Sequence, residues 1–381
     1  MKVHCLNAIS PKGTSLMEGY EFTDELKDAD AVLVRSAKMH DMEIGDGLLS
    51  VARAGAGVNN IPLEAYAEKG IVVFNTPGAN ANAVKELIVA ALLLTSRDIH
   101  GGMKWVEENA GDPDIAKTVE KAKKAFAGRE IMGKTLGVVG LGAVGAMVAE
   151  AALSLGMKVI GYDPFLSVNA AWRISPACVK SDDLKKMAAQ CDYVTIHVPA
   201  TPATNGMIDA EIIGAMKPDA VLLNFSRDSL VDEEALTAAL EEGKISRYIS
   251  DFPNPVSVKM KNTLLVPHLG ASTEEAEDNC AVKAALQTMD YLENGNIVNS
   301  VNFPAVSLGA KSGPRAVVLA AASDTLAAQV SEALAGCGIS GMACQTRGAN
   351  AAMLVDLAQA PDQAAVAKIE AIPGVYRVRV L

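Results

Sequence analysis

Residues 137–163, GVVGLGAVGAMVAEAALSLGMKVIGYD, are the part of the chain from which its architecture can be worked out. An apolar run predicts a strand, a helical pattern follows, and a second short strand ends at Asp163. Three glycines lie between the first strand and the helix, in the spacing G-x-G-x-x-G: Gly140, Gly142 and Gly145. The first permits a tight turn, the second lets a pyrophosphate approach the backbone, and the third lets helix pack on strand. The stretch therefore predicts a dinucleotide-binding βαβ unit.

The residues after this turn indicate which dinucleotide is bound. Asp163 lies 18 residues after Gly145, where a carboxylate can accept hydrogen bonds from both ribose hydroxyls. Tyr162 and Pro164 flank it, and no adjacent Arg could hold a 2′-phosphate, so the sequence favours NAD over NADP. A glycine-rich turn without a ligand is the alternative. The combination of strand, turn, helix, strand and terminal acid favours the cofactor.

Composition limits the classes of function. A chain of 381 residues, half of them apolar, predicts two or three globular domains. The net charge of −11 argues against nucleic acid as a partner. Six scattered Cys residues without a C-x-x-C pair favour reduced thiols in the cytoplasm and no metal site. The N-terminus lacks the apolar run of a signal peptide, and the longest apolar run, Leu87–Leu94, is too short to cross a membrane.

Strand and helix patterns alternate on both sides of the glycine turn, which is typical of an α/β fold. Buried parallel strands are expected at 31–34, 51–54, 71–74, 193–198, 220–224, 248–251 and 263–266. Helices are expected at 82–96 and 274–292, with a polar helical connector at 97–136. We expect two doubly wound, Rossmann-like parallel-sheet domains. Their predicted extents are 1–96 with 284–305 for the substrate-binding domain and 97–283 for the NAD-binding domain.

The C-terminal residues 314–381 predict a third, compact module. Residues 306–314 resemble a linker, and the patterns that follow have the order βαββαβ of a ferredoxin-like unit. No cluster of catalytic residue types occurs in this module, so a dimerisation role without a ligand is its simplest interpretation.

A chain that holds NAD needs a group that exchanges a proton with an alcohol or ketone, and a cation for the acid end of the substrate. Among the five His residues, His197 and His268 follow predicted strands. Ligands of open α/β sheets bind beyond the carboxyl ends of the strands, so both qualify. We interpret His197 as the more ordinary buried histidine.

Several segments together resemble the D-2-hydroxyacid dehydrogenase family. Besides the glycine motif they are VARAGAGVNNI (51–61), FNTPGANANAVKEL (74–87), NFSRDSLVDEEAL (224–236) and VPHLGASTEEAE (266–277). The resemblance covers about residues 30–305. The C-terminal module, with AAMLVDL followed by IEAIPGVYRVRVL, resembles an ACT domain.

The family resemblance implies a role for individual residues. Arg227 would bind the substrate carboxylate and polarise the reacting carbon–oxygen bond, and His268 would exchange the hydroxyl proton. Backbone N–H groups of Ala56 and Gly57 would bind the carboxylate, and Asn80 would contact the substrate. The implied cofactor contacts are Gly140, Leu141, Gly142, Ala143, Val144, Gly145, Asp163, His197, Val198, Pro199, Ser226, Asp251 and Gly270.

Two features depart from the family patterns. A Glu usually pairs with the catalytic His, but Pro255 holds the aligned position and no Glu occurs between 243 and 273. The working hypothesis is therefore His268 alone or with Asp251, rather than an arrangement using Lys259 or Lys261. In the ACT-like module, AAASDTLAA (320–328) lacks the glycine turn that exposes backbone to an amino acid, which predicts weak or absent inhibition by serine.

The expected substrate is a small phosphorylated 2-hydroxy acid. Arg35 and Arg53 are the candidates for binding its phosphate, and basic residues of a neighbouring subunit are a weaker alternative. Reduction of hydroxypyruvate or glyoxylate, oxidation of another D-2-hydroxy acid, and an NAD-sensing role like that of corepressors built on this fold stay open. The resemblance also implies a homodimer or higher homo-oligomer.

Overall fold

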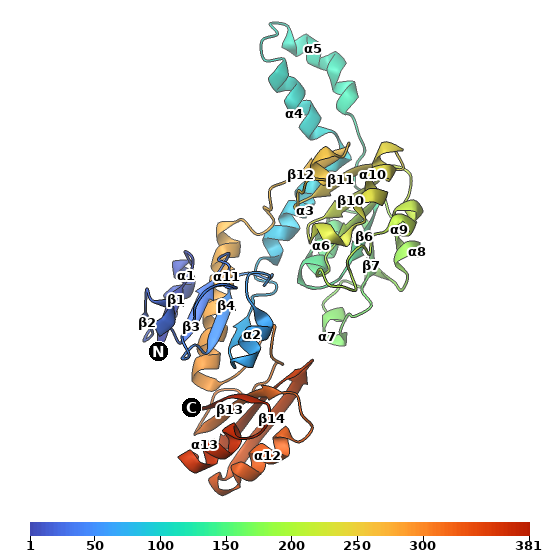
Figure 1. Cartoon of the computed structure of the whole chain (residues 1–381). Coiled ribbons are helices and arrows are strands. Elements are labelled where there is room, and N and C mark those ends of the chain that lie inside the picture. The colour runs from blue at the N-terminus through green and yellow to red at the C-terminus, as the bar shows by residue number, and fades with distance from the viewer. The chain divides into compact units, whose positions relative to one another are not determined.

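The computed structural model describes residues 1–381 (Figure 1). The chain divides into two compact units, Met1–Asn80 with Glu274–Leu381, and Ala81–Thr273. The units thus divide at 80/81 and 273/274, whereas the sequence analysis placed boundaries at 96/97 and 283/284. The C-terminal module lies within the first unit. The three-domain division stays a prediction.

A five-stranded sheet with only parallel pairings forms the centre of the first unit, in the order β2-β1-β3-β4-β5. Its strands are β1 (Lys2–Cys5), β2 (Glu21–Phe22), β3 (Ala31–Val34), β4 (Ser50–Arg53) and β5 (Val72–Phe74). Its helices are α1 (Pro11–Thr14), α2 (Leu63–Glu68) and α11 (Glu274–Asn294). The central strand β3 reads AVLV and is buried throughout, as expected for a parallel strand covered on both faces.

The second unit contains a seven-stranded sheet, again with only parallel pairings, in the order β12-β11-β10-β9-β6-β7-β8. The strands are β6 (Thr135–Val139), β7 (Lys158–Tyr162), β8 (Cys178–Ser181), β9 (Tyr193–Ile196), β10 (Ala220–Asn224), β11 (Ile245–Ser250) and β12 (Thr263–Leu265). The connecting helices are α3 (Ala81–Ser96), α6 (Ala143–Ser154), α7 (Val168–Ala171), α8 (Leu184–Ala188), α9 (Ala210–Ala215) and α10 (Glu233–Glu241). The predicted Rossmann-like α/β architecture is confirmed.

The predicted connector forms two helices, α4 (Ile99–Glu108) and α5 (Ile115–Ala122), which extend from the second unit as a hairpin (Figure 1). The Asp98 side chain caps α4 by accepting a hydrogen bond from Gly101 N–H. Neither helix contains a buried residue. None of the helices in the chain combines the length and apolar character needed to cross a membrane.

The C-terminal module has the predicted βαββαβ order: β13 (Arg315–Ala321), α12 (Leu326–Ala333), β14 (Ile339–Arg347), β15 (Asn350–Leu357), α13 (Gln363–Glu370) and β16 (Val375–Val380). Its sheet is antiparallel, in the order β14-β15-β13-β16. Successive side chains of a strand point to opposite faces. Val318 accordingly packs with Val330 of α12, whereas Val317 and Leu319 belong to the same core as Leu33 of β3. The module and the first sheet therefore share a core.

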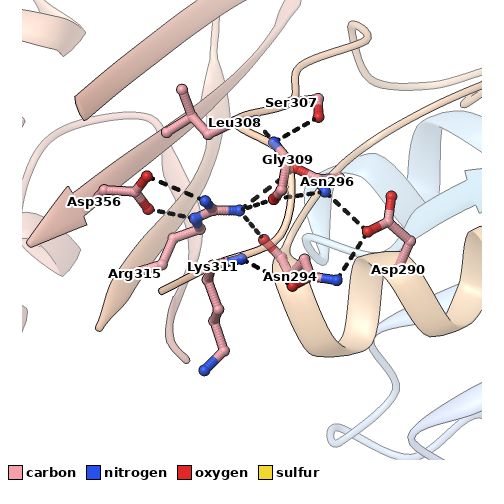
Figure 2. Close-up of polar contacts among 9 residues, drawn as sticks. All are labelled: Asp290, Asn294, Asn296, Ser307, Leu308, Gly309, Lys311, Arg315 and Asp356. Carbon is pink, nitrogen blue, oxygen red and sulfur yellow. Dashed lines mark hydrogen bonds and ion pairs between the residues drawn. The ribbon is translucent and has the colours of Figure 1, made fainter. Parts of the chain in front are cut away.

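A buried arginine fixes the segment that leads into this module (Figure 2). Arg315 is fully buried and binds both carboxylate oxygens of Asp356, at 2.5 and 3.1 Å. Its Nη1 donates to the carbonyl oxygens of Asn294, at the end of α11, and of Gly309, at 2.7 and 2.8 Å. Arg315, directly after the predicted linker, thus holds that linker at Gly309 and binds it to the end of α11.

Candidate functional site

The predicted cofactor and catalytic residues of the second unit gather at one edge of its sheet. Because all its strands are parallel, their carboxyl ends meet at the same edge, where ligands of such sheets bind. The residues that follow these ends are the glycine turn after β6, Asp163 after β7, His197 after β9, Arg227 after β10, Asp251 after β11 and His268 after β12. Their positions along the chain had suggested this arrangement.

The geometry of the glycine turn fits a dinucleotide. Gly140 has a φ of 88°, which a residue with a side chain rarely adopts. A Cβ on Gly145 would lie 1.9 Å from the carbonyl oxygen of Gly140, so only glycine permits this packing. A Cβ on Gly142 would meet no atom within 4 Å, which leaves space next to the backbone. Helix α6 begins after Gly142 without a side-chain cap, so its first N–H groups can bind phosphate oxygens.

Asp163 is held in place by backbone N–H groups. Its two oxygens accept hydrogen bonds from Leu141 N–H at 2.9 Å and Phe165 N–H at 3.0 Å. A cavity of about 720 Å³ adjoins it, and its lining includes Lys180 and the 85% exposed Trp172. The sequence analysis did not single out Trp172. An isolated aromatic residue in an irregular segment gives no periodic signal.

His197 is half-buried, and one of its ring nitrogens has a hydrogen-bond partner. Its Nε2 lies 3.0 Å from the Thr195 hydroxyl. Loss of hydration on burial lowers the pKa of the imidazole to about 3, because the charged form is disfavoured. The ring is therefore neutral at physiological pH, and its position after β9 remains compatible with a cofactor contact.

Arg227 is anchored through its own backbone and that of its neighbour. Asn224 Nδ2 donates to the Arg227 carbonyl oxygen at 2.7 Å, and Arg227 Nη1 donates to the Ser226 carbonyl oxygen at 2.5 Å. The Ser226 hydroxyl donates to the carbonyl oxygen of Ile196 in β9 at 2.8 Å. Partial burial lowers the guanidinium pKa from its ordinary value, yet arginine keeps its charge. The site thus holds a fixed cation.

His268 has a backbone conformation that is uncommon for a residue with a side chain. Its φ is 56°, in the left-handed region, and its N–H donates to the Val266 carbonyl oxygen at 3.0 Å. The side chain is exposed. Its ring centroid lies 4.7 Å from that of Phe252. Such a strained turn, imposed by surrounding contacts, is characteristic of functional sites.

Asp251 supports the backbone after His268 rather than its imidazole. The carboxylate is 1% exposed and accepts hydrogen bonds from Leu269 N–H at 2.6 Å and Gly270 N–H at 2.7 Å. Burial raises its pKa, and these backbone hydrogen bonds oppose that rise. Neither oxygen binds the His268 ring. A direct catalytic or nicotinamide contact by Asp251 stays a prediction.

The predicted substrate residues of the first unit follow β3, β4 and β5. Arg35 forms an ion pair with Glu277 of α11 at 2.5 Å, and Arg53 Nε donates to the Arg35 carbonyl oxygen at 3.0 Å. Ala56 and Gly57 belong to the loop after β4, and no hydrogen bond within the chain uses their N–H groups. Asn80 is the last residue of this part of the unit.

No group of three or more His, Cys, Asp or Glu side chains is arranged to hold a metal ion. The cysteines are all free. Lys259 lies in a 3₁₀ turn, Ser257–Lys259, and neither it nor Lys261 has a hydrogen bond that would tie it to His268.

Comparison with known proteins gives consistent matches. Residues 89–270 match the family model of the D-isomer specific 2-hydroxyacid dehydrogenases, NAD-binding domain. The chain is 38% identical over 306 residues to D-3-phosphoglycerate dehydrogenase of Synechocystis, covering 77% of this chain and 52% of that protein. It is 36% identical over 302 residues to D-3-phosphoglycerate dehydrogenase of Methanocaldococcus jannaschii, covering 76% and 55%. The chain thus spans about half the length of these relatives.

Solved structures agree with this assignment. NAD⁺-bound 3-phosphoglycerate dehydrogenase of Entamoeba histolytica aligns with a TM-score of 0.63 at 28% identity, over 79% of this chain and 98% of that chain. D-mandelate dehydrogenase of Rhodotorula graminis aligns with a TM-score of 0.67 at 22% identity, over 80% and 98%, which supports the fold alone. Residues 89–270, just under half of the chain, are thus similar to the NAD-binding domain of the D-isomer specific 2-hydroxyacid dehydrogenases.

Proposed function

We propose that the protein catalyses the NAD-dependent oxidation of 3-phospho-D-glycerate to 3-phosphohydroxypyruvate, the first step of serine biosynthesis. The observation that carries this proposal is the position of Arg227 and His268. They follow β10 and β12, which flank β11 in the sheet that presents the dinucleotide turn. The names of the 36–38% identical relatives support the choice of substrate.

The roles of the residues follow from their chemistry. When bound at the glycine turn, NAD⁺ would supply the acceptor for the hydride that leaves C2 of the substrate. The His268 imidazole takes the hydroxyl proton during oxidation and returns it during reduction. The Arg227 guanidinium holds the substrate carboxylate and stabilises negative charge on the reacting oxygen. The free N–H groups of Ala56 and Gly57 add donors for the carboxylate, and Asn80 is a further substrate contact.

Arg53 and Arg35 are the proposed phosphate ligands. One observation favours a second candidate, because the Arg35 guanidinium is already bound by the Glu277 carboxylate. If the Arg35–Glu277 ion pair persists when substrate binds, fewer N–H donors are free to bind a phosphate. Reduction of hydroxypyruvate or glyoxylate is then the better supported function. An NAD-sensing protein without turnover is the remaining alternative.

The discriminating experiment follows NADH oxidation with 3-phosphohydroxypyruvate, hydroxypyruvate and glyoxylate. We expect the phosphorylated substrate to be preferred, and His268→Ala to lower kcat by roughly 10²- to 10⁴-fold. Arg53→Ala should raise KM for 3-phosphohydroxypyruvate while leaving the other two substrates unaffected. Lys261→Ala, an exposed neighbour, serves as the control. Unchanged turnover in His268→Ala would refute the proposed chemistry, and NADH binding without turnover would favour the sensor.

We further propose a cytoplasmic homo-oligomer whose C-terminal module is ACT-like and confers weak or no inhibition by serine. The six free thiols support the compartment. The βαββαβ order supports the kinship of the module. The same assay with added L-serine tests the regulation, since strong inhibition at micromolar serine would contradict this proposal.

A further inference from the structure

Phe252 lies where the two proposed catalytic side chains meet, and this placement follows from the order of the strands. The carboxyl end of β11 lies between those of β10 and β12. Arg227 follows β10 and His268 follows β12, so the loop after β11 lies between them. Phe252 is the second residue of that loop.

The Phe252 ring contacts both catalytic groups. Its centroid lies 4.7 Å from the centroid of the His268 imidazole, at an interplanar angle of 50°. The Arg227 Cζ lies 5.0 Å from the same centroid, over the face of the ring. Both distances lie within the range in which an aromatic ring attracts a cation.

The loop that carries Phe252 is itself fixed. Phe252 N–H donates to the Ser250 hydroxyl at 3.1 Å. Two residues on, Asn254 Nδ2 donates to Asp228 at 3.1 Å and to Glu233 at 2.5 Å. Asp228 directly follows Arg227 in the chain, so these hydrogen bonds tie the Phe252 loop to the Arg227 loop. The ring is therefore a fixed support rather than a mobile surface side chain.

The His268 imidazole takes part in no side-chain hydrogen bond or ion pair, and its ring contact is with Phe252. Asp251 is the only carboxylate between residues 243 and 273. Both of its oxygens bind backbone N–H groups of Leu269 and Gly270. These bonds fix the backbone on which His268 stands but leave rotation about its side-chain bonds free. The ring contact is what limits that rotation.

We propose that Phe252 is a positioning residue, which holds the His268 imidazole beside the Arg227 guanidinium through contact with its ring. The inference rests on the proposed function. The aromatic face is attractive to the imidazolium that forms when His268 takes the substrate proton. In this way an aromatic ring orients a base that has no hydrogen bond to a carboxylate.

The test compares Phe252→Leu, Phe252→Tyr and Phe252→Trp in steady-state kinetics. Phe252→Leu removes the ring and should lower kcat by roughly 10- to 100-fold, because a small misplacement of a catalytic group is costly. Phe252→Tyr and Phe252→Trp restore an aromatic face and should stay within about threefold of the original kcat. The dissociation constant for NADH should not change. Phe22→Leu, which removes a 45% exposed ring in β2, is the matched control.

A double-mutant cycle separates positioning from general damage. In a His268→Ala background, Phe252→Leu should lower kcat by a much smaller factor than in the original background, because only its contact with Arg227 remains. A loss as large as in the original background would overturn the inference, as would an unchanged kcat in Phe252→Leu or equal losses in the Tyr and Trp variants. If Phe252→Leu does not fold, Phe252→Met takes its place.

A spectroscopic measurement does not depend on turnover. A nearby aromatic ring shifts the NMR resonances of the His268 imidazole, which are assigned by comparison with His268→Asn. Those resonances should move in Phe252→Leu and stay near their original position in Phe252→Tyr, and unmoved resonances in Phe252→Leu would overturn the inference. If the original protein turns over no 2-oxo acid, the proposed function fails, while this measurement still decides the placement of the ring.

Discussion

At the scale of single residues, His197 should make the free energy of unfolding depend on pH. Its folded-state pKa is lowered to about 3 by burial, from an ordinary value of 6.5. Below pH 6.5 the unfolded chain binds a proton at this residue and the folded chain does not. The stabilisation is therefore complete above pH 6.5 and is lost as the pH falls towards 3. For each additional proton bound by the unfolded chain, the free energy of unfolding falls by about 1.4 kcal/mol per pH unit.

The measurement is urea unfolding of the cofactor-free protein between pH 7 and pH 4.5. His197→Asn should show a weaker decline of unfolding free energy over this range than the original protein. His100→Asn, which alters an exposed histidine of α4, is the control and should keep the full decline. If the free energy of unfolding falls equally with pH in the original protein and in His197→Asn, the His197 imidazole binds a proton in the folded protein and the prediction is wrong.

The limits of sequence reasoning are clearest at single residues. The glycine turn could be predicted because each glycine has a separate steric reason, which the structure shows at Gly140 and Gly145. The sequence identified Asp251 as the carboxylate nearest to His268 along the chain. It could not show that both oxygens of Asp251 accept hydrogen bonds from backbone N–H groups. Phe252 could not be found at all, because its neighbours are set by the order of three strands that the sequence does not state.

At the scale of elements, apolar runs predicted the central buried strands and the edge strands β5 and β12, but they missed the edge strand β8. The central strands β9 and β10 are buried at every position. The edge strand β8, Cys178–Ser181, has no buried residue and reads CVKS. Its parallel partner β7 places it in the sheet. Pairing that depends on a neighbouring strand rather than on burial leaves no periodic signal in the sequence.

The Arg315 cluster of Figure 2 gives a prediction for the contact between elements. Arg315 joins β13 to Asp356 of β15, to the end of α11 and to Gly309. Arg315→Met should lower the free energy of unfolding by roughly 3 kcal/mol, because the Asp356 carboxylate and the Asn294 carbonyl oxygen lose the guanidinium that binds them. Urea unfolding of the intact chain measures this.

Lys311→Met changes an exposed cation of the same segment and should alter stability by less than about 0.5 kcal/mol. The double variant Arg315→Met with Asp356→Leu should recover part of the loss, since it removes the unpaired carboxylate. Equal free energies of unfolding for Arg315→Met and Lys311→Met would show that the Arg315 cluster contributes little to the packing of the C-terminal module within the first unit.

At the scale of the whole molecule, the helical hairpin α4–α5 supports our expectation that the protein forms a homo-oligomer. Ile99, Met103 and Val106 are spaced i, i+4 and i+7, so they share one face of α4. They are 36%, 60% and 49% exposed. A hairpin that buries none of its residues gains little stability from its own chain. A second copy that covers this face would supply the missing burial.

We therefore predict that Met103→Asp with Val106→Asp halves the molar mass measured by light scattering after size-exclusion chromatography. Two carboxylates on this face would have to lose their hydration in the interface, which opposes association. Leu286→Asp, which places the same charge on a 52% exposed position of α11, should leave the mass unchanged. A 39.7 kDa mass for the original protein, or an unchanged mass for the double variant, would rule out α4 as the interface.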